Sequence, residues 1–238
     1  MKHFIKVFLR KLGFEIKRYK PFYIFECQVN TWLKQNPVDV VLDIGANTGQ
    51  YASRLLISGH KEDIISFEPL SDAYKKLLEN SSKYKNWHIA PRMAIGDFDG
   101  ETVINISANS ESSSIMPMLP EHEMSEPASK YIKTEKTQVC TLDRLIGNVI
   151  PCCYKSLFVK IDVQGYEDKV LSGIKNNFNM VKAIQVELST MPLYGGQKLY
   201  YDIIDFLIKK GFTLYALGQV FTDKSTGRFF QFDGFFVK

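Results

Sequence analysis

An acid and two glycines follow an apolar run near residue 40, in an order that could bind a ligand. The segment 40–49 reads VVLDIGANTG. Its residues of interest are Asp43, Gly45, Ala46, Asn47 and Gly49. Glycine lets the backbone approach a ligand closely and eases the entry into a helix. The G-x-G-x-x-G spacing of a loop that binds the pyrophosphate of a dinucleotide is absent. A carboxylate in this place suits a ligand with an ammonium group, such as a methionine moiety, better than a phosphate.

A second acid ends the next apolar run. Glu68 follows the segment IISF at 64–67 and lies 25 residues after Asp43. An acid at the end of a second parallel strand can accept both hydroxyls of a ribose, as in dinucleotide folds. A lone glutamate there is often only a charge at a helix N-terminus. Together with the first motif, Glu68 indicates a ligand that contains a nucleoside.

Three further charged residues could act on a substrate. Lys160 and Asp162 belong to the segment KIDVQGYE at 160–167, and Glu187 interrupts the apolar segment QVELS at 185–189. Asp162 could orient a cofactor amine, bind substrate or accept a proton, or it could cap the following helix. A buried acid is unfavourable unless paired, so Glu187 is either bonded structurally or functional. Lys160 could pair with either acid.

The sequence indicates no dedicated metal site. No two histidines show ligand spacing, and the four cysteines contain no C-x-x-C pair. A weak divalent-cation alternative remains at Asp162 and Glu187. His122 could accept a proton, although we expect a solvated loop histidine.

Alternating patterns along the chain must position these residues. Apolar runs rich in β-formers predict strands over 39–44, 63–67, 87–95, 157–163, 183–188, 213–217 and 229–237. Helical spacing predicts helices over 50–58, 71–81, 166–175 and 198–210. This alternation predicts an α/β fold with a doubly wound, mostly parallel sheet. Residues 97–142 break the rhythm, with an edge-type strand at 100–107 and no clear period at 110–127. We interpret them as an insertion over the active site, where Ser112, Ser113 and Ser114 could line the substrate opening.

The first 36 residues are predicted to be an N-terminal helical extension before a main domain at 37–238. Apolar residues lie at helical spacing in an amphipathic helix over 4–16. The first twenty residues carry seven basic side chains and one acid, a net charge of +6, so the remainder carries 4 − 6 = −2. The helix could pack on the domain, or residues 1–20 could contact a membrane surface. The acidic remainder gives nucleic-acid binding no support.

No apolar run approaches the ~20 residues that a membrane span needs. Basic residues interrupt the N-terminal apolar stretch, which argues against a signal peptide. We therefore expect a cytoplasmic protein, with peripheral contact at the inner membrane surface as the further interpretation.

Several of these blocks together resemble the FkbM family of class I methyltransferases. The resemblance rests on 43–49, FEP at 67–69, AIGD at 94–97 with Asp99 and Gly100, TLD at 141–143, and KIDVQGYE at 160–167. It covers the chain from about residue 38 to the C-terminus. The family usually has Glu where this chain has Gln164, which removes one carboxylate.

The resemblance implies a Rossmann-like methyltransferase sheet with an antiparallel C-terminal strand, and S-adenosylmethionine as the cofactor. The turn with Asp43, Gly45 and Asn47 would line the methionine end. Glu68 would hold the ribose, and the segment near Ala94 would flank the adenine. The implied reaction is O-methylation of a hydroxyl on a sugar, glycan or other small polar metabolite. The base candidates are Asp162 and Glu187.

Other functions stay open at this point. A non-catalytic adaptor could retain the fold and dock through residues 1–20; it would show no cofactor affinity. A nicotinamide-dependent oxidoreductase is disfavoured because G-x-G-x-x-G is missing. RNA methylation is weakened by the acidic remainder and by the lack of an Asn-Pro-Pro-aromatic motif. The sequence specifies neither the acceptor nor the oligomeric state.

Overall fold

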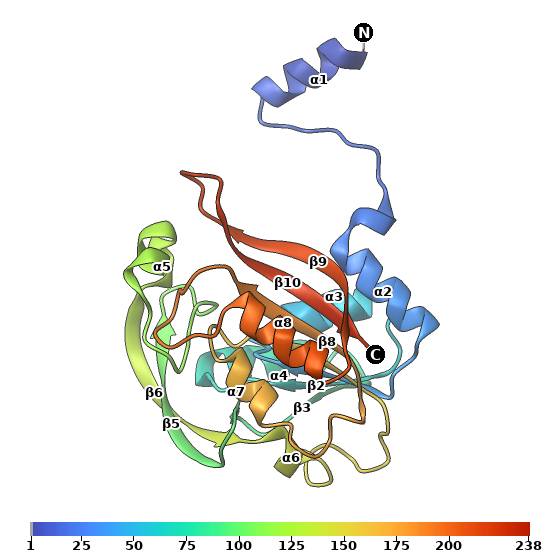
Figure 1. Cartoon of the computed structure of the whole chain (residues 1–238), viewed down its shortest axis with the longest axis vertical. Coiled ribbons are helices and arrows are strands. Elements are labelled where there is room, and N and C mark those ends of the chain that lie inside the picture. The colour runs from blue at the N-terminus through green and yellow to red at the C-terminus, as the bar shows by residue number, and fades with distance from the viewer. Residues whose placement is uncertain (1) are drawn as a thin grey trace.

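The computed structural model describes residues 2–238, and the side chains of residues 5–219 and 221–238. Its centre is a seven-stranded sheet in the order β3-β2-β1-β7-β8-β10-β9 (Figure 1). The strands are β1 (Val40–Ile44), β2 (Asp63–Phe67), β3 (Trp87–Ile89), β7 (Leu157–Ile161), β8 (Val181–Ser189), β9 (Thr213–Thr222) and β10 (Phe229–Val237). Neighbouring strands from β3 to β8 are parallel, and β10 is antiparallel to both β8 and β9. The predicted doubly wound sheet with an antiparallel C-terminal strand is confirmed.

The chain reverses its direction of winding between β1 and β7. From β1 it proceeds outward to β2 and β3, and it then returns to place β7 on the other side of β1. Ile44 and Ile161 are partners in that pairing, at the carboxyl ends of the two strands. In open α/β sheets, ligands bind in the crevice at such a switch point.

Helices cover both faces of the sheet because strand residues alternate between the faces. Val41, Ile64 and Phe158 pack against α2 (Phe25–Gln35), α3 (Gln50–Ile57) and α4 (Ser71–Ser81). Val40, Leu42 and Ile65 pack against the other group of helices. That group comprises α6 (Leu142–Leu145), α7 (Glu167–Ser172) and α8 (Tyr200–Lys209).

Helix α2 belongs to the packed core, although it precedes the predicted boundary at residue 37. Phe25, Val29, Trp32 and Leu33 are all buried in one cluster with the sheet. The Trp32 ring meets the Phe235 ring of β10 edge to face, at 5.5 Å between centroids. The division of the chain after residue 36 stays a prediction about domains.

The segment predicted as an irregular insertion contains a second sheet. β4 (Ala94–Ile95), β5 (Gly100–Ser107) and β6 (Tyr131–Cys140) lie in the order β4-β6-β5. The predicted strand at 87–95 is therefore two strands in two sheets, and β6 was not predicted at all. Most side chains of β6 are polar and few are buried, so the strand carries no apolar alternation. Its backbone pairing with β5 holds it in place. α5 (Pro120–Ser125) and the 3₁₀ turns Pro21–Tyr23 and Pro127–Ser129 complete the described elements.

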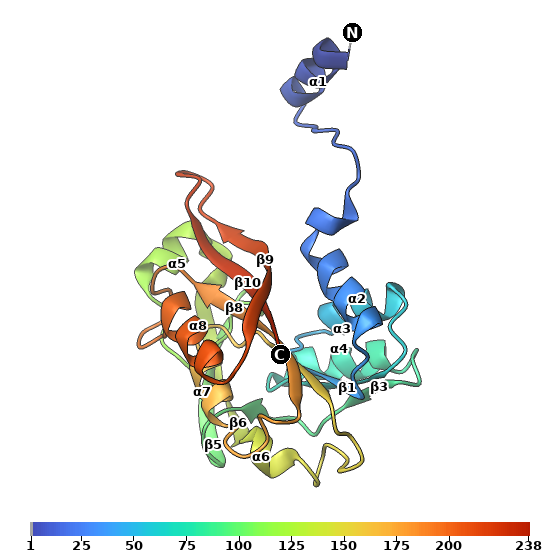
Figure 2. The same ribbon diagram turned by 45° about the vertical axis from the view of Figure 1, so that its right-hand side comes forward.

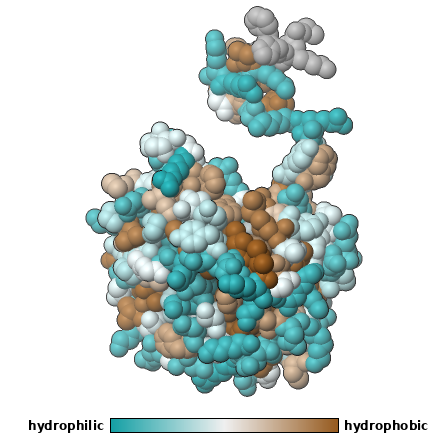
Figure 3. Space-filling view, in the orientation of Figure 1, coloured by the Kyte–Doolittle hydropathy of each residue, from teal (hydrophilic) through white to brown (hydrophobic). Residues whose placement is uncertain are grey.

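Helix α1 (Lys2–Lys11) stands away from the rest of the chain in both ribbon views (Figures 1 and 2). The helical spacing of apolar residues over 4–16 predicted an end near Gly13, and the helix ends at Lys11, just before Gly13, whose φ is +82°. Ile5 and Phe8 in this helix and Leu12 just after it are exposed, at 53%, 62% and 57%, while Leu9 is half-buried. In Figure 3, apolar and hydrophilic side chains both lie on this segment. Among the described residues, no helix has the length and apolar character needed to cross a membrane.

Candidate functional site

A cavity of about 330 Å³ lies at the switch point between β1 and β7. Its lining residues come from the carboxyl ends of the parallel strands and from the segments that follow them. Glu68 after β2, Asp162 after β7 and Glu187 in β8 all contribute, and so does Asp233 from the antiparallel β10. Because the strands lie side by side in this order, the acids form a row across the sheet edge.

The turn after β1 is held by backbone contacts. The N–H groups of Gly45 and Ala46 donate to the carbonyl oxygen of Phe67, at 3.1 and 3.0 Å. A Cβ on Gly45 would lie 1.8 Å from the carbonyl oxygen of Asp162. A Cβ on Gly49 would lie 2.4 Å from the Trp87 ring. Both glycines therefore allow close packing between parts of the protein, whereas we had expected Gly45 to allow close approach of a ligand. Gly45, Ala46 and Asn47 do line the cavity, and Gly49 does not.

Glu68 is 3% exposed and lines the cavity. Its carboxylate accepts the N–H groups of Asn47, at 2.7 Å, and Leu70, at 2.8 Å, one on each oxygen. Burial raises the pKa of Glu68 to about 7. A carboxylate has about four acceptor positions, so each oxygen of Glu68 can still accept a ligand hydroxyl.

Lys160 joins two acids of the site. Its ammonium lies 3.4 Å from Asp43 Oδ1 and 3.4 Å from Asp162 Oδ2. Burial alone would lower the pKa of Lys160, but the carboxylates of Asp162 and Asp43 raise it above its ordinary value. Lys160 is therefore a cation, and its charge opposes the effect of burial on the pKa of Asp43.

Asp43 lies behind Lys160 and does not line the cavity. It is fully buried, and burial raises the pKa of its carboxyl group. Ser66 Oγ donates to its Oδ2 at 3.1 Å, while Oδ1 has no hydrogen bond among the described residues. Direct contact of Asp43 with a cofactor stays a prediction.

Asp162, Gln164 and Glu187 lie together at the cavity wall. Gln164 Nε2 donates to Asp162 Oδ1 at 2.9 Å and to Glu187 Oε2 at 3.0 Å. Gln231 Nε2 also donates to Glu187 Oε2, at 2.5 Å. Burial raises the pKa of Glu187 well above its ordinary value, and the nearby carboxylate of Asp162 adds to this effect. Glu187 is thus both bonded structurally and part of the cavity.

Several lining residues were not singled out from the sequence. These are Tyr51, Arg54, Gln185 and Asp233, which also border a second hollow of about 190 Å³ against α2. Burial raises the pKa of Asp233 to about 6, and Gln185 Nε2 donates to it at 3.0 Å. An acid in the otherwise aromatic strand FFQFDGFFV carried the same signal that drew attention to Glu187.

The segment after β5 contributes to the site, as predicted for part of the insertion. Ser110, Glu111 and Ser113 line the cavity, and Ser114 Oγ donates to the carbonyl oxygen of Gln164 at 2.6 Å. His122 does not line it. It is 3% exposed and packs against the ring of Tyr194, so the expectation of a solvated loop histidine is wrong. Burial lowers the pKa of His122 to about 4.

Two other motif acids have local structural contacts. Asp143 Oδ2 accepts the N–H groups of Lys175 and Asn176 at 2.9 and 2.8 Å. Asp97 pairs with Lys169 at 3.4 Å. Ala94 does line the cavity, next to Met93 and Ile95, and supplies an apolar wall beyond Glu68.

This sheet order is the Rossmann-like arrangement expected from the sequence, with the cavity and its row of acids at the switch point. The family model described as the methyltransferase FkbM domain matches residues 43–214, and the chain belongs to this family. The resemblance inferred from the motifs is confirmed.

Two curated relatives are named as methyltransferases. Hexuronic acid methyltransferase AglP of Haloferax volcanii is 30% identical over 154 residues, which are 63% of this chain and 56% of that protein. The chain thus spans little more than half the length of that relative. 2-O-methyltransferase NoeI of Sinorhizobium fredii is 26% identical over 74% of this chain and 73% of that protein. Among solved structures, the chain is similar to an rRNA methylase from Streptococcus thermophilus, with a TM-score of 0.47, 12% identity, and coverage of 94% of this chain and 99% of that one.

Proposed function

We propose that this protein transfers the methyl group of S-adenosylmethionine to a hydroxyl of a sugar or another small polar acceptor. One observation carries the proposal. A single cavity is lined both by Glu68, whose carboxylate oxygens still have lone pairs for a ligand, and by the Lys160–Asp162 ion pair. Membership of the FkbM family supports the reaction class. The name of the relative AglP, a hexuronic acid methyltransferase, supports a sugar as the acceptor, and the name of NoeI, a 2-O-methyltransferase, supports transfer to an oxygen atom.

The residues present fit the cofactor. Glu68 would accept the ribose hydroxyls on its remaining lone pairs. Met93, Ala94 and Ile95 would flank the adenine with apolar surface, and the turn at Ala46 and Asn47 would meet the methionine end. When bound, the cofactor supplies a methyl group already activated by a positively charged sulfur.

Asp162 is better placed than Glu187 to accept the acceptor's proton. Its side chain is 38% exposed, and the Lys160 ammonium stabilises its charge. Glu187 is 6% exposed, and its raised pKa favours the protonated form, which cannot take up a proton. The polar side chains of Ser110 and Gln185 can hydrogen-bond to the hydroxyls of an acceptor. Alignment of the acceptor oxygen would supply much of the acceleration.

Calorimetry of S-adenosylmethionine and S-adenosylhomocysteine tests the cofactor assignment. We expect binding by the wild type, its loss in Glu68→Ala, and its retention in Glu79→Ala, which removes an exposed acid of α4. Circular dichroism checks that each variant is folded. A folded wild type without affinity for either ligand would favour the non-catalytic adaptor. Methyl transfer from labelled cofactor to uronic acids, neutral sugars and an RNA transcript then separates the acceptor classes.

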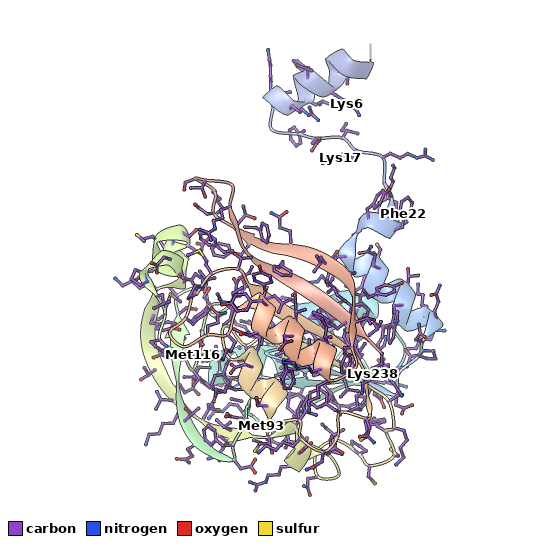
Figure 4. All side chains as sticks on the ribbon, in the orientation of Figure 1. Lys6, Lys17, Phe22, Met93, Met116 and Lys238 are labelled. Carbon is purple, nitrogen blue, oxygen red and sulfur yellow. The ribbon has the colours of Figure 1, made fainter. Side chains whose placement is uncertain are left out.

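We also propose peripheral contact of residues 1–20 with an anionic membrane surface. Phe8 in helix α1 and Leu12 just after it are exposed, and the neighbouring basic side chains are exposed as well. Figure 4 labels Lys6 and Lys17 on this segment, away from the rest of the chain. Basic amphipathic helices bind by burying apolar side chains in the headgroup region while their cations attract anionic lipids.

Sedimentation with lipid vesicles tests this contact. We expect the full chain to bind phosphatidylglycerol vesicles but not pure phosphatidylcholine, and to lose the binding at high salt. The Lys6→Gln/Lys11→Gln variant should bind more weakly. The Lys75→Gln/Lys76→Gln variant, with the same charge change on exposed positions of α4, should bind like the wild type. Equal binding by the two variants, or no binding by the wild type, would contradict the proposal.

A further inference from the structure

We propose that Gln164 is a positioning residue whose neutral amide holds the carboxylates of Asp162 and Glu187 together and keeps Asp162 ionised. This inference rests on the proposed function, in which Asp162 is the proton acceptor. The two amide hydrogens of Gln164 each have one carboxylate partner, at 2.9 Å on Asp162 and 3.0 Å on Glu187. The amide therefore bridges the two acids and supplies each of them with a hydrogen-bond donor.

The orientation of this amide is determined by its surroundings. Tyr194 is fully buried, and its hydroxyl donates to Gln164 Oε1 at 2.8 Å. The same hydroxyl lies 3.2 Å from the carbonyl oxygen of Ser112, so its single hydrogen favours the shorter contact. Because the amide oxygen faces Tyr194, the NH₂ group must face the two carboxylates. The backbone of Gln164 has a φ of +55°, and Ser114 Oγ donates to its carbonyl oxygen.

The charges around Asp162 and Glu187 explain why a neutral hydrogen-bond donor is suitable at position 164. The charged or titratable groups that influence these two acids are Lys160, Asp43, Glu167 and Asp233. Only one of these four is a cation. A hydrogen bond donated to a carboxylate favours its ionised form, whereas another nearby carboxylate disfavours it. A glutamate at position 164 would have at most one hydrogen to donate, even when protonated, so it could not donate to both carboxylates.

Two other glutamines in the same region act in the same way. Gln231 Nε2 donates to Glu187, and Gln185 Nε2 donates to Asp233 at 3.0 Å. Gln164 and Gln185 line the cavity and Gln231 does not, but all three amides add donors without adding charge. Among these three glutamines, only Gln164 contacts Asp162.

Carbon-13 NMR of the side-chain carboxyl groups tests the inference on the full chain without cofactor or acceptor. Interacting acids titrate as a pair, so the two midpoints of Asp162 and Glu187 are followed together. We expect Gln164→Glu to raise the lower midpoint by about one pH unit or more, because a third carboxylate joins the pair. The control Gln138→Glu adds the same charge at an exposed position of β6 and should leave both midpoints unchanged.

Gln164→Met provides a second test, which decides the matter if the glutamate variant does not fold. It removes both donors without adding charge, and it should also raise the lower midpoint. Midpoints equal to those of the wild type in the folded variant would overturn the inference. If an acceptor is found, the acid limb of the pH–rate profile should move upward in Gln164→Glu by the same amount as the midpoint. A protein that transfers no methyl group would contradict the proposed function while the NMR result still stands.

Discussion

Gly45 and Asp162 are in direct backbone contact: a Cβ added to Gly45 would lie 1.8 Å from the carbonyl oxygen of Asp162. The N–H of Asp162 also donates to the carbonyl oxygen of Ile44, at 3.1 Å. The turn after β1 and the end of β7 are therefore packed together without an intervening side chain. This contact connects the turn assigned to the cofactor with the residue assigned to proton transfer.

Gly45→Ala should destabilise the fold by at least about 2 kcal/mol, because the new methyl group collides with a backbone oxygen that no rotamer can move. Its φ of +78° adds strain for any residue with a Cβ. Urea unfolding measures the effect. Gly59→Ala is the matched control, since Gly59 has a φ of +94° and no atom within 4 Å of the added Cβ. The control should show only the strain, roughly 1–2 kcal/mol. Equal losses in the two variants would contradict the steric argument.

Lys160→Met should cost roughly 3–5 kcal/mol of unfolding free energy, because it leaves the buried Asp43 carboxylate without its cation. Adding Asp43→Asn should restore part of the loss by removing the unpaired charge. A double-mutant cycle from urea unfolding gives the coupling. Lys209→Met breaks an exposed pair with Asp205 and should have little effect. A double variant no more stable than Lys160→Met would argue against the buried pair.

Glu167 should make the protein less stable as the pH rises from about 4.5 to about 7. Burial raises the pKa of Glu167 to about 7, so over this range the folded state holds a proton that the unfolded state releases. Glu167→Gln keeps an Oε1 that can accept the N–H groups of Val163 and Gly165, and it removes the titration. The wild type should lose roughly 1–3 kcal/mol more than the variant over this range. Parallel pH dependences from urea unfolding would contradict this expectation.

Asp162→Asn should lower the turnover rate about 10²–10⁴-fold, because an amide cannot accept the proton of the hydroxyl. The affinity for S-adenosylmethionine should change much less, since other residues hold the cofactor in the proposed arrangement. Glu187→Gln should reduce turnover less than Asp162→Asn does. Asp205→Asn, on the exposed face of α8, serves as the matched control. Turnover by Asp162→Asn equal to that of the control would require another proton acceptor.

The predicted strands of the main sheet agree with the structure because their signals are local. Val40–Ile44 and Asp63–Phe67 are short apolar runs bounded by turns, and each is almost completely buried. β6 was missed for the opposite reason. Its residues are mostly polar, few of them are buried, and its strand conformation depends on pairing with Gly100–Ser107, about 30 residues earlier in the chain.

The residues of the candidate site also fall into two groups, those with a local sequence signal and those without one. Glu68, Asp162 and Glu187 were found because an acid at the end of an apolar run is unusual, and all three line the cavity. The same signal was present at Asp233 but was not used. Tyr194 and Arg54 carried no such signal, because an aromatic residue or an arginine in a loop or helix has many ordinary explanations.

The sequence by itself predicted the strands of the main sheet, the family, and the acids Glu68, Asp162 and Glu187 that line the cavity, because periodicity and motif spacing are properties of neighbouring residues. Only the tertiary structure decided that Lys160 pairs with Asp43 and Asp162, that Gln164 bridges two acids, and that His122 is buried. These relationships join residues up to 117 positions apart, from Asp43 to Lys160. Such distances between atoms depend on how the strands are arranged in the sheet, which no local pattern specifies.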